Sequence, residues 1–453
     1  MRATARFLYR SYSLFHSISF WLQRHITPAG ALMAGILLLT GLFGLNMFRT
    51  TLYQAMALSL FVLVVSAILS LVPFRPRIRV KHLFPVYGTV GEKLVYSIEI
   101  TNLGLKPEKG IILYEDPADP RPDLTTLLAR KEPYEHLRNA WDRKILYYRW
   151  AWLILKSGKA RLRSIPLPDL PAGETLRVTS DFTPGFRGYL HFTGVTLARP
   201  DALGIFMRCF RIPKAEKLLV LPRRYPLHPP DLRSRRQYHP GGVSLASSIG
   251  NSDEFMGLRY YRPGDPLRHI HWRSFARTGE LVIKEFEDEF FVRYALILDT
   301  FVSPEREAVF EDAVSIAASY AAAVEPHDAI LDLMVAGKNM YSFSSGRGLG
   351  SSEKMLEILS CIEPCPDKTL LELKPALEAG LKKISGAVCI FSGWDRAHEE
   401  ILRMIREALV PVFVVVIAAD ASHKAALERK TRNLDHRVRV VQTGKISEGL
   451  SAP

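Results

Sequence analysis

Two long runs of uncharged apolar residues near the start of the chain restrict most strongly what it can fold into. Residues 29–48 read AGALMAGILLLTGLFGLNMF, and residues 52–72 read LYQAMALSLFVLVVSAILSLV. Each run has roughly the 20 residues that a helix needs to cross a bilayer. Only three residues separate the runs, so we expect a hairpin of two transmembrane helices within residues 29–74. The alternative is a helical hairpin buried in a soluble domain.

Positive charge flanks the two runs. Nine Lys or Arg residues and no Asp or Glu precede Glu92, so nine of the fourteen excess positive charges lie beside the predicted spans. Because positive residues stay on the cytoplasmic side of membranes, we expect a multi-pass inner-membrane protein with cytoplasmic N- and C-termini. We therefore expect this positive charge to lie against the lipid bilayer, and we expect no nucleic-acid partner. Residues 1–28 predict a basic amphipathic segment on the inner leaflet.

The remaining residues predict at least two further domains. From 75 to 222, short alternating runs such as 95–100 and 176–182 stand between turn-forming residues, which is typical of a β-sandwich. An aromatic stretch near 124–155 predicts a helical insertion. We expect its tryptophans and tyrosines to pack on the sandwich, with the membrane interface as the alternative. Residues 223–240, rich in Arg and Pro, predict an extended linker, with binding to anionic lipid or nucleic acid as the weaker hypothesis.

The C-terminal part of the chain alternates strands and helices. This pattern over residues 291–445 predicts a mostly parallel α/β sheet, and ligands of such sheets bind where the strands end, here at 299–303 and 392–395. Residues 446–453 are expected to be a disordered tail. The four cysteines form no second pair that would complete a zinc site, which favours free thiols in a reducing compartment. The expected fold is therefore multidomain, with a transmembrane hairpin, a β-sandwich and an α/β domain.

Residues 241–290 mix charged and aromatic side chains most densely. They fit a catalytic site, a docking surface for a partner, or an internal ion-pair network. Paired Arg and carboxylate groups are typical of the network, and exposed Arg, Tyr and Trp are typical of interfaces. We favour the network, with docking second. The candidate residues are Glu254, Arg259, Tyr261, Asp265, Arg268, His271, Trp272, Arg277 and Lys284.

The same block carries a resemblance to a known family. Its pattern comprises Glu254-Phe255, Arg259, Tyr261, Gly264-Asp265, Arg268, Ile270, Trp272, Ala276-Arg277, Leu281 and Lys284. Together with the two apolar runs, the sandwich segments 100–107 and 182–206 and the strand LILDT, this resembles the bacterial family known as DUF58. Many relatives have Asp before the Trp, whereas this chain has His271.

The resemblance implies a von Willebrand factor A-like C-terminal domain. Such domains often bind Mg²⁺ through Asp-x-Ser-x-Ser, but this chain reads Asp299-Thr300-Phe301-Val302-Ser303, in which Phe301 replaces the first serine. Asp299 and Ser303 are therefore degenerate metal positions, and we expect no cofactor. His269 and His271 would share one face of a strand and hold a metal, but hydrogen bonding of His271 within the block is the favoured interpretation.

The resemblance also implies a partner rather than an activity. It predicts a membrane-anchored partner of MoxR-type AAA+ ATPases, with transglutaminase-like membrane proteins as further partners, and it brings no defined reaction. No P-loop, nucleophile elbow, HExxH or dinucleotide fingerprint appears in the sequence. We therefore expect a scaffold or adaptor without catalytic activity that acts in envelope or protein-complex assembly. The alternative is an enzyme or metal-dependent binding protein with a site between the block and the sheet edge.

Overall fold

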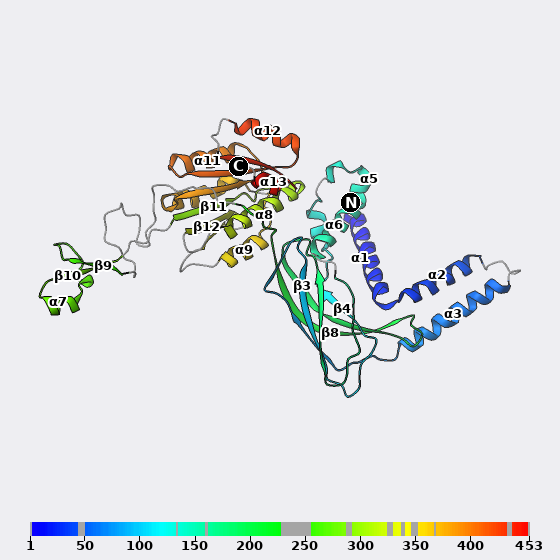
Figure 1. Ribbon diagram of the computed structural model, residues 1–453. Helices are drawn as coiled ribbons and strands as arrows, with labels where there is room; N and C mark the ends of the chain where they lie inside the picture. The colour runs from blue at the N-terminus through cyan, green and yellow to red at the C-terminus, as the bar shows by residue number, and fades with distance from the viewer. Residues whose placement is uncertain are drawn as a thin grey trace. The chain divides into compact units, whose positions relative to one another are not determined.

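The computed structural model separates the chain into two compact units, Met1–Pro222 and Arg223–Pro453, which are described one at a time. The structure describes residues 2–43, 50–132, 135–158, 162–227, 255–286, 292–323, 329–336, 340–345, 352–366, 368–432 and 437–451. Both units combine helices with sheets (Figure 1). A multidomain chain of mixed helix and sheet is therefore confirmed.

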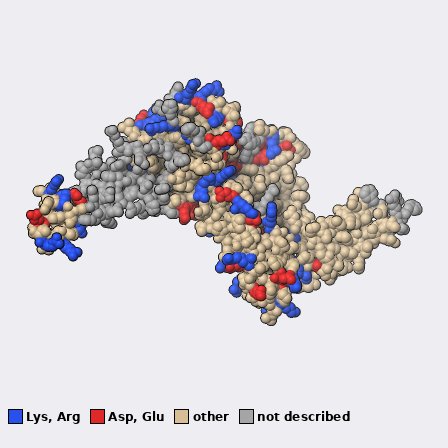
Figure 2. Space-filling model, in the orientation of Figure 1, with Lys and Arg blue, Asp and Glu red and all other residues tan. Residues whose placement is uncertain are grey.

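The first unit begins with three helices, α1 (Arg2–His25), α2 (Pro28–Phe43) and α3 (Thr50–Ser70). Helices α2 and α3 lie side by side (Figure 1). Helix α3 is long and apolar enough to cross a membrane over Thr51–Ser70, whereas α2 is a shorter apolar helix. Residues 44–49, which include the last five residues of the first predicted run, lie outside the described residues. The visible surface of the pair carries no charged side chain (Figure 2).

Asp201 connects the sandwich to α3. It lies in the loop between β7 (Gly188–Pro200) and β8 (Met207–Leu221) and is 6% exposed. Its carboxylate accepts the backbone N–H groups of Leu203 at 3.1 Å and Ile205 at 3.0 Å. It also accepts the hydroxyl of Ser66, a fully buried residue of α3. One carboxylate therefore shapes the loop and joins it to the apolar helix.

The same loop also contacts the junction between α1 and α2. The backbone N–H of Thr27 donates to the Ile205 carbonyl at 3.0 Å, and the Thr27 hydroxyl donates to the Gly204 carbonyl at 2.6 Å. A Cβ atom on Gly30 would lie 2.4 Å from the Ile205 carbonyl oxygen, so only glycine permits this close approach. The start of α2 is thus held against the sandwich.

Two sheets form a β-sandwich around one core. Alternation along β3 (Leu94–Asn102) buries every second side chain, as the pattern at 95–100 predicts. Ile98 and Ile100 of β3 pack in the same cluster as Phe192 and Leu197 of β7, from the opposite sheet. The three-stranded sheet contains β1 (Ile78–Leu83), β3 and β6 (Thr175–Phe182). The five-stranded sheet contains β2 (Tyr87–Thr89), β8, β7, β4 (Ile112–Pro117) and β5 (Ile165–Pro166).

The aromatic insertion is helical but divided. It contains α4 (Leu124–Ala129), α5 (Ala140–Ile145) and α6 (Tyr147–Gly158), and α5 ends because Leu146 adopts a left-handed conformation with φ 62°. Trp150, 5% exposed, forms a small core with Leu127 and Leu153 against Tyr9 and Tyr12 of α1. The predicted packing on the sandwich is therefore wrong for Trp150, which packs on α1 instead. Trp141 is 69% exposed.

In the second unit, six strands form one sheet. Its order is β13 (Met340–Ser345), β12 (Ala329–Ala336), β11 (Val292–Leu298), β14 (Gly386–Phe391), β15 (Val412–Ala418) and β16 (Val438–Gln442), and only β13 runs antiparallel to its neighbour. The helices that accompany this sheet are α8 (Glu307–Ala323), α9 (Ser352–Cys361), α10 (Lys374–Gly380), α11 (Arg396–Glu407), α12 (Ala421–Thr431) and α13 (Ile446–Ser451). Ala295 and Ile297 pack with residues of α10, α11 and α12. Their neighbours Leu296 and Leu298 must point to the other face, where α8 contacts β11.

Helix α13 corrects the prediction of a disordered tail. Ile446 and Leu450 are 1% and 6% exposed, so the apolar side of this short helix is buried. Gly449 lies against Val441 of β16, where an added Cβ would come within 2.7 Å of a Val441 methyl carbon. The sequence did not predict this helix because the segment is short and because its burial depends on contact with β16, which exists only in the folded sheet. Residues 452–453 lie outside the described residues.

Replacing Asp201 by Ala should destabilise the first unit. The substitution leaves buried backbone N–H groups and the Ser66 hydroxyl without their acceptor, which costs about 1–3 kcal/mol for each unpaired group. We expect a lower midpoint of thermal unfolding for the full-length protein in detergent. The matched control is Asp169→Ala, because Asp169 is 61% exposed and pairs only with Lys109 at the surface. Equal midpoints for the two variants would contradict the role assigned to Asp201.

Candidate functional site

The charged and aromatic block folds as a strand pair with a short helix. Strand β9 (Phe255–Tyr260) pairs antiparallel with β10 (Val282–Phe286), and α7 (Trp272–Thr278) lies between them in sequence. Ile270 and Ile283 are 5% and 0% exposed and form a bridge that closes the unit. Gly279, at φ 74°, ends α7 in the left-handed conformation that glycine favours. Glu254 and residues 241–253 lie outside the described residues.

Arg259 and Asp265 form the predicted type of internal ion pair. The two terminal nitrogens of Arg259 each donate to one oxygen of Asp265 at 2.7 Å, and the backbone N–H of Arg262 donates to the same carboxylate at 2.8 Å. The Arg259 Nε also pairs with Glu285 at 2.8 Å. The bonds from Arg259 and Arg262 lower the pKa of Asp265 to about 2. This network fixes the turn after β9 against β10.

His271 has a structural partner within the block. Its Nδ1 lies 2.7 Å from the Ser274 hydroxyl at the start of α7. His269 ends a 3₁₀ turn and His271 precedes α7, so the two histidines do not occupy one face of a strand. Among the described residues, no group of three or more His, Cys, Asp or Glu side chains is placed to hold a metal ion. Hydrogen bonding within the block is therefore the better account of His271.

Other side chains of the block remain at the surface. On α7, Trp272 is 61% and Phe275 is 38% exposed, and their rings meet edge to face at 6.1 Å. Arg273 and Arg277, four residues apart on the same helix, are also exposed. We call Trp272, Arg273, Phe275 and Arg277 the α7 surface. Arg268, in the turn before α7, is exposed as well, whereas Tyr261 and Lys284 are half-buried.

At the edge of the large sheet, Asp299 is buried and fully engaged. It follows β11 and is 2% exposed. One carboxylate oxygen accepts the backbone N–H of Phe301 at 2.9 Å, and the other accepts that of Ser392 at 3.0 Å. The second oxygen also lies 3.3 Å from Nε2 of His398. Ser303 precedes a 3₁₀ turn and makes no capping bond through its side chain. Asp299 and Ser303 are thus turn residues here.

His398 joins two carboxylates that are far apart in sequence. Its Nδ1 lies 2.7 Å from Asp395, which caps α11, and its Nε2 faces Asp299 of the neighbouring strand. Burial by itself lowers the pKa of His398, but the hydrogen bond and charge of Asp299, and then those of Asp395, outweigh burial and raise this pKa. The two carboxylates therefore stabilise the protonated form of His398 relative to the neutral form. The sequence analysis missed His398, and the Asp-x-x-His spacing of its capping box was the only local signal.

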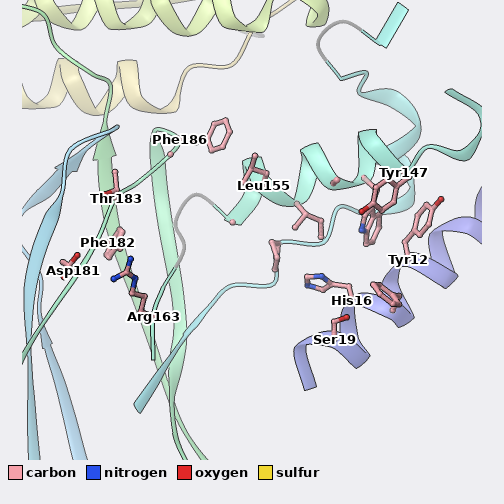
Figure 3. A pocket seen from close by; sticks show the side chains of 17 residues that line it. Tyr12, His16, Ser19, Tyr147, Leu155, Arg163, Asp181, Phe182, Thr183 and Phe186 are labelled. Atoms are coloured by element: carbon pink, nitrogen blue, oxygen red, sulfur yellow. The ribbon is translucent and has the colours of Figure 1, made fainter. Parts of the chain in front are cut away.

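A pocket of about 1010 Å³ lies in the first unit (Figure 3). Its walls come from α1, α6 and the corner between β6 and β7, and they are mainly aromatic and aliphatic, with Tyr12, Trp150 and Phe182 among them. His16 and Arg163 supply polar groups at its rim. Such a lining suits binding of an apolar group better than acid–base chemistry. No sequence pattern predicted this pocket, because α1 lies more than 100 residues before its other walls in the sequence.

The raised pKa of His398 predicts a pH-dependent stability. A folded-state pKa above 6.5 stabilises the fold fully below pH 6.5, and this contribution disappears as the pH rises through the folded-state value. The unfolding midpoints of wild type and His398→Gln should therefore differ most at acidic pH and converge at alkaline pH. The matched control is His423→Gln, because burial and Arg306 lower the pKa of His423 and give the opposite trend. Parallel curves for wild type and His398→Gln would refute the assignment.

Comparison with known families gives a match within the second unit. Residues 257–406 match the model of a family described as "Protein of unknown function DUF58". A protein of Bacillus subtilis (strain 168), described as uncharacterized protein YeaD, is 30% identical over 178 residues, which are 38% of this chain and 42% of the relative. This chain therefore covers less than half of the length of that relative.

Two of the similar solved structures match about a third of the chain. A CARDB domain from Pyrococcus furiosus has 10% identity and a TM-score of 0.16, and covers 33% of this chain and 96% of its own. A PapD-like domain of human CEP192 has 11% identity and a TM-score of 0.15, and covers 32% and 82%. Neither is close enough to indicate a shared fold. The family match and the Bacillus relative support membership of this chain in the DUF58 family.

Proposed function

We propose that this chain is a membrane-anchored, non-enzymatic scaffold whose folded domains face the cytoplasm. The observation that carries the proposal is α3, a helix of 21 residues without a charge whose surface is largely exposed. At 1.5 Å per residue it extends about 30 Å, the thickness of the hydrocarbon layer of a bilayer. With α2 beside it, the pair forms a hairpin of two spans. The arginines before α2 and after α3 support a cytoplasmic position of both flanks in this proposal.

The α7 surface is the proposed contact for a protein partner. Trp and Arg are the side chains that most often dominate binding at interfaces, and both are exposed here. The Arg259–Asp265–Glu285 network stabilises the strand pair that presents α7. The backbone that carries the binding side chains is therefore already ordered, which lowers the entropy lost on binding. One part of the block is thus structural, and another part binds. In this proposal the ion-pair hypothesis applies to the Arg259–Asp265–Glu285 network, and the docking hypothesis applies to the α7 surface.

The partner class follows from the family resemblance. A von Willebrand factor A-like assignment is supported by the mostly parallel sheet with its antiparallel edge strand β13. On this basis we propose a MoxR-type AAA+ ATPase as the partner, acting on envelope or protein-complex assembly, with a transglutaminase-like membrane protein as a further partner. We prefer this role to an enzymatic one because Asp265, His271 and Asp299 already have structural partners.

An affinity pull-down from solubilised bacterial membranes tests this proposal. The full-length protein should retain an AAA+ ATPase, identified by mass spectrometry, and Trp272→Ala or Arg268→Ala should lose most of it. Trp141→Ala is the matched control, because Trp141 is similarly exposed but belongs to α5 of the first unit. Absence of an ATPase from the wild-type sample, or equal recovery with all variants, would count against the proposal.

A further inference from the structure

Helix α1 has one face that packs on the protein. Ala5 is 8% exposed, and the ring of Tyr9 meets that of Trp150 at 5.6 Å. The Tyr12 hydroxyl donates to the Ile145 carbonyl at 3.0 Å, and Arg24 pairs with Asp116 of β4. These contacts come from α5, α6 and the sandwich. They fix the rotation of α1 about its axis, so the opposite face must point away from the unit.

The opposite face is apolar and open. Phe7, Leu14, Ile18 and Trp21 are 69%, 61%, 47% and 50% exposed. Their spacings of seven, four and three residues place them in one stripe along the helix. Leu22, 41% exposed, widens the stripe. Isolated exposed apolar residues are ordinary, but a stripe along most of a 24-residue helix indicates a binding face.

The charges beside the stripe indicate what covers it. Helix α1 contains no Asp or Glu, and the exposed Arg6 and Arg10 lie at its edge, with Arg10 one turn from both Phe7 and Leu14. Two copies of this face packed together would bring arginines near arginines without an acidic partner in either helix. An anionic lipid surface instead offers phosphates to the arginines and an apolar layer to the stripe. Trp21 suits the boundary between the two.

The position of α1 relative to the proposed spans agrees with this occupant. The chain turns sharply between α1 and α2, so the α2–α3 pair runs off at a steep angle to α1 (Figure 1). The bonds of Thr27 to the β7–β8 loop hold that turn. We infer that α1 lies in the cytoplasmic surface of the bilayer, with the Phe7–Leu14–Ile18–Trp21 stripe inserted roughly 5–10 Å at the level of the headgroups. This inference rests on the proposed membrane anchoring.

Site-specific fluorescence quenching tests the inference. The full-length protein, with its native cysteines replaced, receives one cysteine at a time: Ile18→Cys in the stripe, Phe61→Cys in α3, or Leu105→Cys, a 94% exposed site in the sandwich. Each carries the same fluorophore in vesicles of phosphatidylglycerol and phosphatidylethanolamine. Nitroxide lipids quench either near the headgroup or near the chain end. We expect loss of most Ile18 fluorescence with the headgroup-level quencher, of Phe61 fluorescence with the chain-end quencher, and no loss at Leu105.

The outcomes separate the inference from the proposal on which it rests. If Ile18 behaves like Leu105 while Phe61 is quenched, the stripe faces water and only the inference fails. If Phe61 also escapes quenching, membrane anchoring itself fails. If the Ile18 fluorophore is shielded from both lipid nitroxide and aqueous iodide, protein covers the stripe, and a second copy replaces the membrane as its occupant.

Replacing phosphatidylglycerol by phosphatidylcholine should weaken quenching at Ile18 and leave Phe61 unchanged. Equal quenching at Ile18 in both lipids would remove the role given to Arg6 and Arg10.

Discussion

The exposed apolar surface of α3 is the feature on which the rest of the account depends, because it is unfavourable in water and favours an apolar environment. Leu58, Phe61 and Ile68 are each at least 60% exposed, and burial of one such side chain is worth about 1.5–3 kcal/mol. The described parts of the chain leave this surface uncovered, so a bilayer is the solvent that suits it best. The backbone of a helix satisfies its own hydrogen bonds, which allows it to enter hydrocarbon without further partners.

The sandwich holds the helices that we propose as the membrane anchor. Asp201 joins the β7–β8 loop to α3 through a buried hydrogen bond, and Thr27 joins the same loop to the α1–α2 junction through a partly buried one. Arg24 adds an ion pair from the end of α1 to β4. In the proposed anchoring, an orientation imposed by the membrane on α2 and α3 would be transmitted to α1 and to the sandwich. In the second unit, Arg259 with Asp265 and His398 with Asp299 use charge to stabilise local structure.

Local patterns predicted the elements, and long-range contacts account for the differences. The alternation at 95–100 predicted β3 because every second residue of that strand is buried, and the apolar run at 292–298 predicted β11 because consecutive residues of that strand are buried. Strand β8 went unrecognised because charged residues and Pro213 interrupt its apolar pattern. Only the folded chain places Tyr12 beside Trp150 or His398 beside Asp299. The Arg259–Asp265 pair was predictable because six residues separate its members, whereas the exposure of the α7 surface was not.

Alkaline carbonate extraction of bacterial membranes tests the central claim of anchoring most directly. Wild-type protein should stay in the membrane pellet. Phe61→Arg combined with Val64→Arg should release it, because each arginine at the centre of a span costs about 2.5–3.5 kcal/mol. Leu105→Arg, at an exposed site of the sandwich, should leave it in the pellet. Folded wild-type protein in the carbonate supernatant would contradict the account.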